Sequence, residues 1–586
     1  MRKKLTYGLL IAGCSLLSPP SLAAFIMNGK AAGNDAPLIK STDPGAERFR
    51  GVGKLFAATH CTATLFSGEK TPDRNSPALV ITAGHCVDSN MGTNQVIVDQ
   101  AAPKEWKYIP DYFVDTHDNS HPVTVRRILY ATMKQVDLAV LQLDKTYGEL
   151  EQQGLFPLKL KKDIQAHNQS IELAHIPVMG VDENEQYLRH SLCHIKGQTP
   201  VLFESNTPWV WGTAYPVDCA GVAGGTSGSP VVEHEQSRII GILNTTVTPG
   251  LTGCGVGRPC EVHNNQPYVN EGVSYFIPVD QVAMAITDDG KLDWSKLENN
   301  GTDILKRNGS WVTKSQVNGH DATWNITIND IANHIRYKAG LANETDCTDI
   351  TGYGNSIATT TQPLSNLVIS KKEGVYLLCV IHQDENGNWT PSSYASHTIH
   401  VIDDTPPKLK PEIEVEEKDD SWVVSPVSMP WELGEPWLKY GPLSSTDCED
   451  KVGYKYYLMP ARLSKSSSPW RFCTYGTDQA GNAGPVNKMD FETSSIKIDN
   501  YRVVAAWNFP LPKEEFLRRT GAISSEGKVF IDISDDKYLS LYTSPGSYEV
   551  PLKAGKSTAK VTLDVLKEHI PPVARTGINK EEKRDR

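Results

Sequence analysis

The chain has 586 residues, which allows about four domains at roughly 150 residues each. Its 45 glycines and 37 prolines favour short strands and turns over long helices. The net charge is -11 and no long basic run precedes the last residues, so the composition argues against nucleic acid as a partner.

The first 23 residues have the pattern of an export signal. Basic residues are followed by an apolar stretch too short to span a bilayer, and small residues precede Ala23. Cleavage after Ala23 would give a secreted protein with an N-terminal or pro segment at 24–45. Ile11–Cys14 alternatively resembles a bacterial lipobox, in which Cys14 would carry a lipid anchor, and a periplasmic location is a further alternative. No other segment predicts a transmembrane helix.

Ten further cysteines favour disulfide bonds over metal binding. An even number of cysteines is typical of disulfides in an exported chain, and no pair has the CxxC spacing of a zinc site. No metal is therefore expected. In chain order they form the neighbouring pairs Cys61 and Cys86, Cys193 and Cys219, Cys254 and Cys260, Cys347 and Cys379, and Cys448 and Cys473.

Short apolar runs predict a β-rich domain over 46–295. Runs at 78–82, 138–143 and 239–243 are separated by turn-rich stretches, as is typical of strands. The sequence IPVDQVAMAI at 277–286 predicts a strand end that leads into a short helix.

The second half contains an internal repeat of about 100 residues. Each copy has two cysteines, an aromatic strand and an Asp-x-x-Gly-Asn turn, as in QDENGNWTP and TDQAGNAGP. That turn resembles one found in bacterial Ig-like and fibronectin-like modules. Period-two patterning at this length predicts β-sandwiches over 300–403 and 421–500. The Pro-rich, charged segment 404–420 predicts a semi-rigid linker, and 501–586 a C-terminal β-rich domain with a charged tail.

Three residues are candidates for nucleophilic catalysis. His85 follows an apolar strand, and histidine is the natural general base near neutral pH. Asp137 begins another apolar strand, where a buried carboxylate needs a partner and could orient an imidazole. Ser227 lies among glycines in GGTSGSP, so a substrate carbonyl could approach it closely. Backbone N–H groups of Gly225 and Ser227 would then form an oxyanion hole. Each side chain alone also fits a structural or solvated role.

The order of these residues excludes one hydrolase class. An α/β-hydrolase elbow, G-x-S-x-G, needs glycine where Ser229 stands, and its order along the chain is Ser, Asp, His. The order here is His85, Asp137, Ser227, as in the chymotrypsin type.

Four motifs in this order resemble the trypsin/chymotrypsin-like serine proteases. CTATLF, TAGHC, DLAVLQL and GTSGSP resemble that family's C-G-G-S-L-I, T-A-A-H-C, D-I-A-L-L and G-D-S-G-G-P over about residues 45 to 290. The resemblance implies an all-β fold, a chymotrypsin-like double β-barrel followed by two or three β-sandwich-like modules. It also implies a His85–Asp137–Ser227 triad between the barrels, no cofactor and a disulfide between Cys61 and Cys86.

Two positions depart from the animal enzymes of that family. Thr226 stands where those enzymes have an aspartate that pairs with the new N-terminus after zymogen cleavage. We therefore expect an oxyanion hole that forms without that switch. Ser229 replaces the last glycine, as in the bacterial G-x-S-G-S-P branch that includes glutamyl endopeptidases.

The resemblance assigns substrate binding to Gly221, Asn244, Thr245 and Thr246. Gly221 stands where trypsins have the pocket aspartate, so a preference for Arg or Lys is not supported. Leu243 stands where glutamyl enzymes have histidine, which weakens a preference for Glu. A small or apolar side chain is the remaining expectation. Cys193–Cys219 would bracket this pocket and Cys254–Cys260 would close a nearby loop.

These observations predict a secreted serine endopeptidase that hydrolyses protein or peptide substrates through an acyl-enzyme. The C-terminal modules would bind the substrate, a surface or a glycan. The alternative is a non-catalytic adhesin or binding protein on a degenerate protease scaffold.

Overall fold

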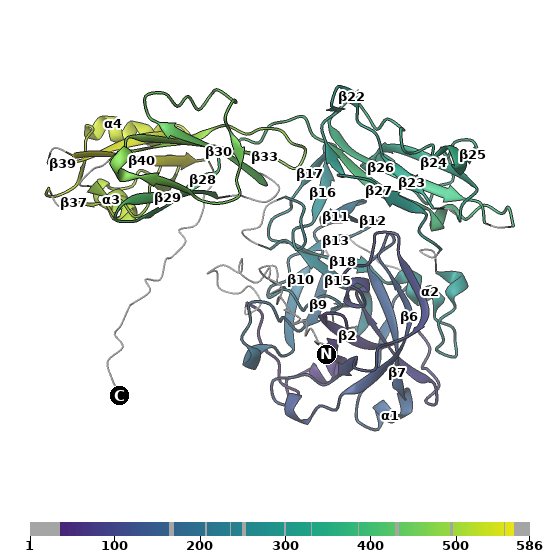
Figure 1. The fold of residues 1–586 in the computed structure, drawn as a ribbon. Coiled ribbons are helices and arrows are strands. Elements are labelled where there is room, and N and C mark those ends of the chain that lie inside the picture. Colours follow the sequence, from purple (N-terminus) through teal and green to yellow (C-terminus); the bar gives the residue numbers. More distant parts are fainter. Residues whose placement is uncertain are drawn as a thin grey trace, which may run out of the picture.

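The computed structural model describes residues 35–567, apart from 163–168, 205–207, 235, 249–252, 298–300, 330, 385, 428–432, 493–495, 525 and 556. The expected signal peptide, Cys14 and the charged tail lie outside the described residues. Strands dominate the described chain, and helices are short (Figure 1). The expected all-β class is confirmed.

A closed six-stranded barrel forms the first part. Its strands follow the order β1-β5-β6-β7-β3-β2, and β1 pairs with β2 to close the ring. The apolar runs expected as strands at 78–82 and 138–143 lie in β3 and β7. The six strands of the ring are β1 Val52–Phe56, β2 His60–Ser67, β3 Pro77–Thr82, β5 Lys107–Ile109, β6 Val123–Thr132 and β7 Leu138–Thr146, and β4 Val96–Ala101 pairs with β6 outside the ring.

A second ring follows the order β10-β9-β14-β15-β18-β13. A bridge between Ile195 and Val217 joins β13 back to β10, so this ring also closes. The expected double barrel is therefore confirmed by the strand pairing. The six strands of this ring are β9 Ser170–His175, β10 Arg189–His194, β13 Tyr215–Val217, β14 Pro230–Glu233, β15 Arg238–Thr246 and β18 Ser274–Pro278, and β8 Leu158–Leu160 precedes them in the chain.

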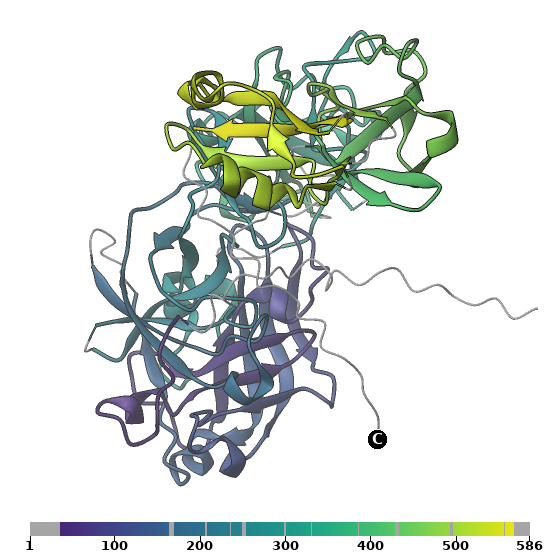
Figure 2. The same cartoon turned by 90° about the vertical axis from the view of Figure 1, so that its left-hand side faces the viewer.

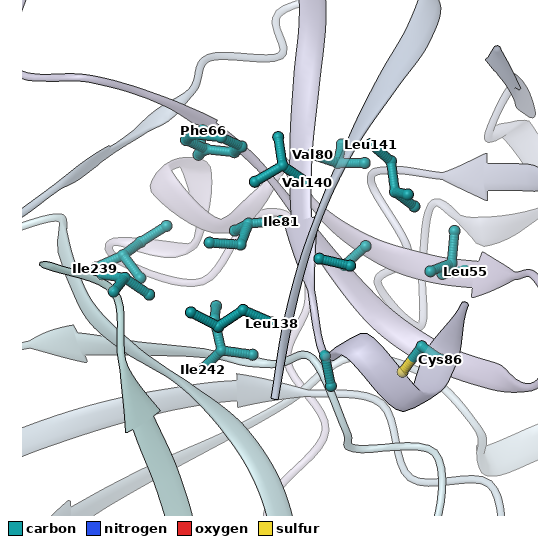
Figure 3. Packing of buried hydrophobic residues seen from close by; sticks show 14 of the residues in the cluster. Leu55, Phe66, Val80, Ile81, Cys86, Leu138, Val140, Leu141, Ile239 and Ile242 are labelled. Carbon is teal, nitrogen blue, oxygen red and sulfur yellow. The ribbon is translucent and has the colours of Figure 1, made fainter. Parts of the chain in front are cut away.

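The two barrels share part of one hydrophobic core. Ile239 and Ile242 of β15 belong to the same buried cluster as Ile81 and Leu138 of the first barrel (Figure 3). The strand β8 pairs with β2 on one side and β15 on the other, which joins the barrels through backbone hydrogen bonds. The two barrels are thus joined both by side-chain packing and by backbone pairing.

Helices are few. The helix α1 (Tyr147–Glu151) begins with a capping box between Thr146 and Glu149, in which side chains satisfy free backbone N–H groups. The helix α2 (Asp280–Ala285) follows β18 directly. The expected strand-to-helix transition at 277–286 is confirmed.

A small sheet lies between the second barrel and the next part of the chain. Its order is β12-β11-β16-β17, with β11 Leu202–Glu204, β12 Trp209–Trp211, β16 Cys260–His263 and β17 Gln266–Tyr268. Its two faces differ in their contacts. Leu202 and Trp211 pack into the core of the barrels, whereas Phe203 and Val210 face the opposite side.

The first repeat, here called module 1, contains β19 to β27. The strands are β19 Leu305–Arg307, β20 Val312–Thr313, β21 Gln316–Val317, β22 His320–Asp321, β23 Ile326–Ile328, β24 His334–Leu341, β25 Ile357–Ala358, β26 Gly374–His382 and β27 Ser396–Ile402. Its largest sheet has the order β20-β27-β26-β24-β25.

The central strand β26 is buried on both faces. Its sequence GVYLLCVIH is a continuous apolar run, as is typical of a strand covered from two sides. Tyr376, Leu378 and Val380 face a core made within module 1. Leu377 and Ile381 face the other way, towards Phe203 and Val210 of the small sheet. Module 1 and the small sheet therefore share one hydrophobic core.

Polar contacts reinforce this attachment. Asn94, in the first barrel's loop before β4, donates to the carbonyl of His397 (2.8 Å) and accepts from its backbone N–H (2.8 Å). Lys134 donates to the carbonyl of Tyr394. Module 1 lies directly against the barrels in Figure 1.

The second repeat, module 2, is a sandwich of two sheets, β28-β29-β32 and β31-β30-β33-β34. Trp422 and Leu463 of one sheet pack on Leu438 and Phe472 of the other. The strands are β28 Glu412–Glu417, β29 Ser421–Val427, β30 Glu435–Pro442, β31 Lys455–Tyr456, β32 Ala461–Ser464, β33 Trp470–Thr477 and β34 Asn487–Phe491.

The prediction that 404–420 is a linker without strands is wrong. Residues 412–417 form β28, which pairs with β29 in register from Glu412↔Val427 to Glu417↔Trp422. In EIEVEE, Ile413 and Val415 alternate with glutamates and pack on the core of module 2. The charged composition concealed this edge strand.

The two repeats have matching local structure. Tyr353 in module 1 donates to the carbonyl of Cys347, and Tyr454 in module 2 donates to that of Cys448, both at 2.8 Å.

The five disulfides join Cys61–Cys86, Cys193–Cys219, Cys254–Cys260, Cys347–Cys379 and Cys448–Cys473. Disulfides persist in oxidising compartments, so they indicate an extracellular or periplasmic protein.

The C-terminal unit has its own core, which includes Phe516, Tyr538 and Leu563. Its main sheet has the order β36-β40-β39-β38, covered by two helices (Figure 2). The elements are β35 Ile496–Lys497, β36 Arg502–Ala506, α3 Lys513–Thr520, β37 Ile523–Ser524, β38 Phe530–Ile531, α4 Asp535–Ser540, β39 Gly546–Ala554 and β40 Ser557–Leu566. Across the described part of the chain, no helix is long and apolar enough to cross a membrane.

Candidate active site

His85 lies in a single 3-10 turn, Gly84–Cys86, that follows β3. The Cys61–Cys86 disulfide ties this turn to β2. Close packing explains the glycine of TAGHC, since a Cβ at Gly84 would lie 2.2 Å from the carbonyl oxygen of Thr132. The backbone of the turn thus packs closely against the end of β6.

Asp137 contacts His85 twice. One carboxylate oxygen accepts the backbone N–H of His85 at 2.9 Å, and the other lies 2.7 Å from Nδ1. The Asp137 side chain is fully buried, whereas 18% of the His85 side chain is exposed. This geometry places the proton of a neutral imidazole on Nδ1 and leaves Nε2 as the acceptor.

The charges around His85 favour its protonated form. Burial alone would lower the pKa of His85, because a charged imidazolium loses hydration. The negative charge of Asp137 and its hydrogen bond, with a further contribution from Glu204, outweigh burial and raise the pKa above its usual value.

Ser227 lies in the loop before β14, on the second barrel. Its hydroxyl donates to the carbonyl oxygen of Asn244 at 3.0 Å, and its own carbonyl accepts the N–H of Thr62 at 2.9 Å. Among the described residues, no hydrogen bond joins Ser227 to His85. Asn244 contacts both sides of the site, because its amide donates to the carbonyl of Asp137 at 2.7 Å.

The backbone at Gly225 leaves two donors free. Gly225 has a φ of +102°, and a Cβ there would lie 2.6 Å from a methyl carbon of Val178, so only glycine fits. Within the described ranges, the N–H groups of Gly225 and Ser227 have no hydrogen-bond acceptor. The adjacent carbonyl of Gly224 accepts two backbone N–H groups, from Val178 and Met179, both at 2.8 Å. Those bonds hold the loop in place.

Thr226 is buried and bonds locally. Its hydroxyl donates to the carbonyl of Ala223 at 2.7 Å, and Ser229 donates to the carbonyl of Thr226 at 2.6 Å. Both hydroxyls therefore stabilise the turn of the loop from within. Residues 24–34, which precede the first described residue, lie outside the described chain.

The four residues predicted to bind substrate differ in how far their side chains are already engaged in contacts within the protein. Asn244, Thr245 and Thr246 end β15, but the Asn244 side chain already binds Asp137 and the N–H of Ile277. Thr246 bonds to Ser274 on the neighbouring strand at 2.9 Å. Gly221 has a φ of +75°, and a Cβ there would lie 2.5 Å from the Cβ of Ala36.

Two residues near the site were not found from the sequence. The ring of Trp209 stacks on His85, with centroids 6.1 Å apart and planes at 20°. The carboxylate of Glu204 is buried and accepts a hydrogen bond from Thr245 at 2.5 Å. A carboxylate at the end of the apolar run VLFE was the available signal for Glu204.

One cluster among the described residues has metal-ligand spacing, namely Cys61, His85 and Cys86. Its two sulfurs are joined in a disulfide, so they cannot act as thiolate ligands.

Known proteins resemble this region of the chain. Residues 61–242 match the family described as "Trypsin-like peptidase domain". No curated protein matches the chain. Solved structures with similarity include a thermostable serine protease, AL20, from an extremophilic microorganism, at 15% identity over 40% of this chain and 92% of that chain, with a TM-score of 0.26. A scabies mite inactivated protease paralogue has 12% identity over 42% and 94%, with a TM-score of 0.28. A Glu endopeptidase in complex with MPD has 14% identity over 42% and 92%, with a TM-score of 0.23.

Proposed function

We propose that the trypsin-like peptidase domain over residues 61–242 makes this chain a secreted serine endopeptidase. The His85–Asp137 pair, with its buried carboxylate, carries the proposal, because it lies in the matched region together with Ser227 and two free N–H donors. A buried carboxylate on Nδ1 is the arrangement that turns imidazole into a general base for a serine hydroxyl.

In the proposed reaction, the Ser227 oxygen attacks the peptide carbonyl carbon while Nε2 of His85 takes the hydroxyl proton. The carbonyl oxygen becomes an oxyanion held by the N–H groups of Gly225 and Ser227, each worth about 3 kcal/mol. The C–N bond then breaks, and His85 returns the proton to the leaving amine. Water attacks the acyl-enzyme by the same route and releases the acid.

Ser227 must first change its hydrogen bond. In the free protein its hydroxyl donates to the carbonyl of Asn244, so the hydroxyl has to turn from Asn244 before it can donate to Nε2 of His85. Hydrogen bonds of catalytic groups often align only when substrate is bound. We propose that the enzyme prefers substrates with a small or apolar side chain before the cleaved bond, and that Gly221, Thr245 and Thr246 line the pocket for that side chain.

The rest of the chain has proposed supporting roles. Residues 1–23 would direct export, and 46–295 would form the trypsin-like protease domain that carries the catalytic residues. The repeats at 300–403 and 421–500 and the unit at 501–586 would bind substrate, a surface or a glycan.

A fluorophosphonate probe tests the proposal directly. We expect one label per folded molecule, and peptide mapping by mass spectrometry should place it on Ser227. Ser229, a buried hydroxyl two residues away, should stay unlabelled and serves as the internal control. Protein unfolded in guanidinium should not react. Folded protein that remains unlabelled would support the non-catalytic adhesin instead, and a label on another residue would exclude Ser227 as the nucleophile.

The pH profile of kcat/KM should reflect the raised pKa of His85. Only neutral His85 can take the serine proton, so activity is present above the pKa and is lost as the pH falls through it. Because that pKa lies above the usual histidine value of 6.5, the acid limb should have its midpoint above pH 6.5. A midpoint below 6.5 in stopped-flow or steady-state assays would contradict the described charge environment.

A further inference from the structure

The strands β11 and β12 form an antiparallel pair that contacts both barrels beside the candidate active site. In their register Glu204 lies directly opposite Trp209. Residues directly opposite each other project from the same face of a sheet. Since Trp209 stacks on His85, Glu204 also lies on the face towards the active site.

Trp209 fixes the side of the pair that touches the first barrel. Its ring covers His85, and its indole N–H donates to the carbonyl of Met91 at 2.7 Å. Thr93 donates to the carbonyl of Pro208 at 2.5 Å. The loop that follows His85 is therefore bonded to the beginning of β12.

Glu204 fixes the side that touches the second barrel. Its carboxylate accepts the hydroxyl of Thr245, the residue after Asn244. Asn244 in turn contacts Ser227 through its carbonyl and Asp137 through its amide. In the described part of the chain, Glu204 has no salt bridge with a lysine or arginine. The group whose positive charge acts on Glu204 is His85 itself.

Module 1 holds the strand pair from behind. Phe203 and Val210, on the opposite face, lie in the core shared with module 1. Nε2 of the buried His397 also donates to the carbonyl of Val210 at 3.0 Å. The position of Glu204 and Trp209 is thus set by packing on two sides.

Two carboxylates act on His85. Asp137 contacts the imidazole directly, and Glu204 is the other ionisable group whose charge raises the His85 pKa. Burial raises the pKa of Glu204 itself to about 7, while the Thr245 hydrogen bond and the charge of His85 lower it in part. An ionised Glu204 therefore stabilises the imidazolium form.

We propose that Glu204 and Trp209 are positioning residues of the active site. Glu204 supplies a second negative charge that stabilises protonated His85 during acyl transfer, and Trp209 fixes the plane of the imidazole. The inference rests on the proposed peptidase activity. It assigns to module 1 the further role of holding this pair in place.

The test compares two buried carboxylates of the same small sheet in the full-length protein. Glu204→Gln keeps a hydrogen-bond acceptor for Thr245 but removes the charge. Glu261→Gln is the matched control, because Glu261 is also buried but its carboxylate binds Tyr275, Asn270 and His263. Kinetics of peptide hydrolysis from about pH 5 to about pH 9 give the acid-limb midpoint for each variant.

Glu204→Gln should move the midpoint of the acid limb to lower pH and reduce the plateau of kcat by roughly tenfold, with little change in KM. Glu261→Gln should leave both at the wild-type values. Trp209→Leu should reduce kcat. Trp209→Phe should keep kcat close to the wild-type value, since phenylalanine keeps a ring that can stack on His85. If Glu204→Gln fails to fold, Thr245→Val removes the bond that favours ionised Glu204 and should shift the midpoint in the same direction.

The outcomes separate this inference from the proposed function. If the wild type reacts with the fluorophosphonate but the midpoint is the same in Glu204→Gln, or equally shifted in Glu261→Gln, the role of Glu204 is wrong. A Trp209→Leu variant with wild-type kcat would overturn the role of Trp209. If the wild-type protein does not react with the fluorophosphonate, the proposed peptidase function is wrong, and the role of Glu204 and Trp209 falls with it.

Discussion

Ser227→Ala is expected to lower kcat for peptide hydrolysis by roughly 10⁶-fold, since removal of a triad nucleophile costs about that much in serine proteases. Without the hydroxyl no acyl-enzyme forms, and only the oxyanion donors and substrate binding contribute. A fluorogenic peptide assay of purified wild type and variant measures the loss. Fluorophosphonate labelling of the variant should be absent.

The variant should remain folded, which separates catalysis from stability. The Ser227 hydroxyl makes one hydrogen bond, to Asn244, and such a bond contributes about 0.5–1.5 kcal/mol. Thermal unfolding should therefore change by only a few degrees. Ser229→Ala, in the same loop, is the matched control and should retain most activity. Activity that survives Ser227→Ala would show that another group is the nucleophile.

The second large effect concerns module 1. A chain that ends after residue 297 is expected to lose the folded, probe-reactive state, whereas a chain that ends after residue 404 is expected to keep it. The shorter chain exposes Phe203, Val210 and Val262, which module 1 covers. At about 1.5–3 kcal/mol for each side chain, this loss amounts to about 5–9 kcal/mol, comparable with the net stability of a typical domain.

Soluble yield, thermal unfolding and fluorophosphonate labelling distinguish the two chains. The longer chain serves as the control, because it also lacks module 2 and the C-terminal unit but retains β26 and β27. A shorter chain that folds and reacts with the probe would show that the small sheet does not depend on module 1.

The double barrel could be predicted from the sequence because four short motifs occur in the order typical of this fold. TAGHC and DLAVLQL place His85 and Asp137 at the ends of strands that pair with each other, β3 with β7. The disulfide from Cys61 to Cys86 followed from the resemblance, and the structure contains it. The all-β class followed from turn composition and period-two runs.

Other features depend on contacts that no local pattern records. Glu204 lies more than a hundred residues from His85, and its role requires the register of β11 with β12. The uninterrupted apolar run of β26 indicates a strand buried on both faces. The sequence does not indicate that the small sheet covers one of these faces. The edge strand β28 lies in a segment whose prolines and charges predict a linker, because only Ile413 and Val415 of its six residues are apolar.

The core shared by the small sheet and module 1 also constrains the order of folding. Phe203 and Val210 complete their packing only after Leu377, Ile381 and Ile399 have been synthesised. These contacts span more than 150 residues, so loop closure must precede their formation. Until about residue 401 has been synthesised, the face of the β11–β12 pair opposite Trp209 lacks the packing of module 1. We therefore expect the packing around His85 and Trp209 to be complete only after module 1 has been synthesised.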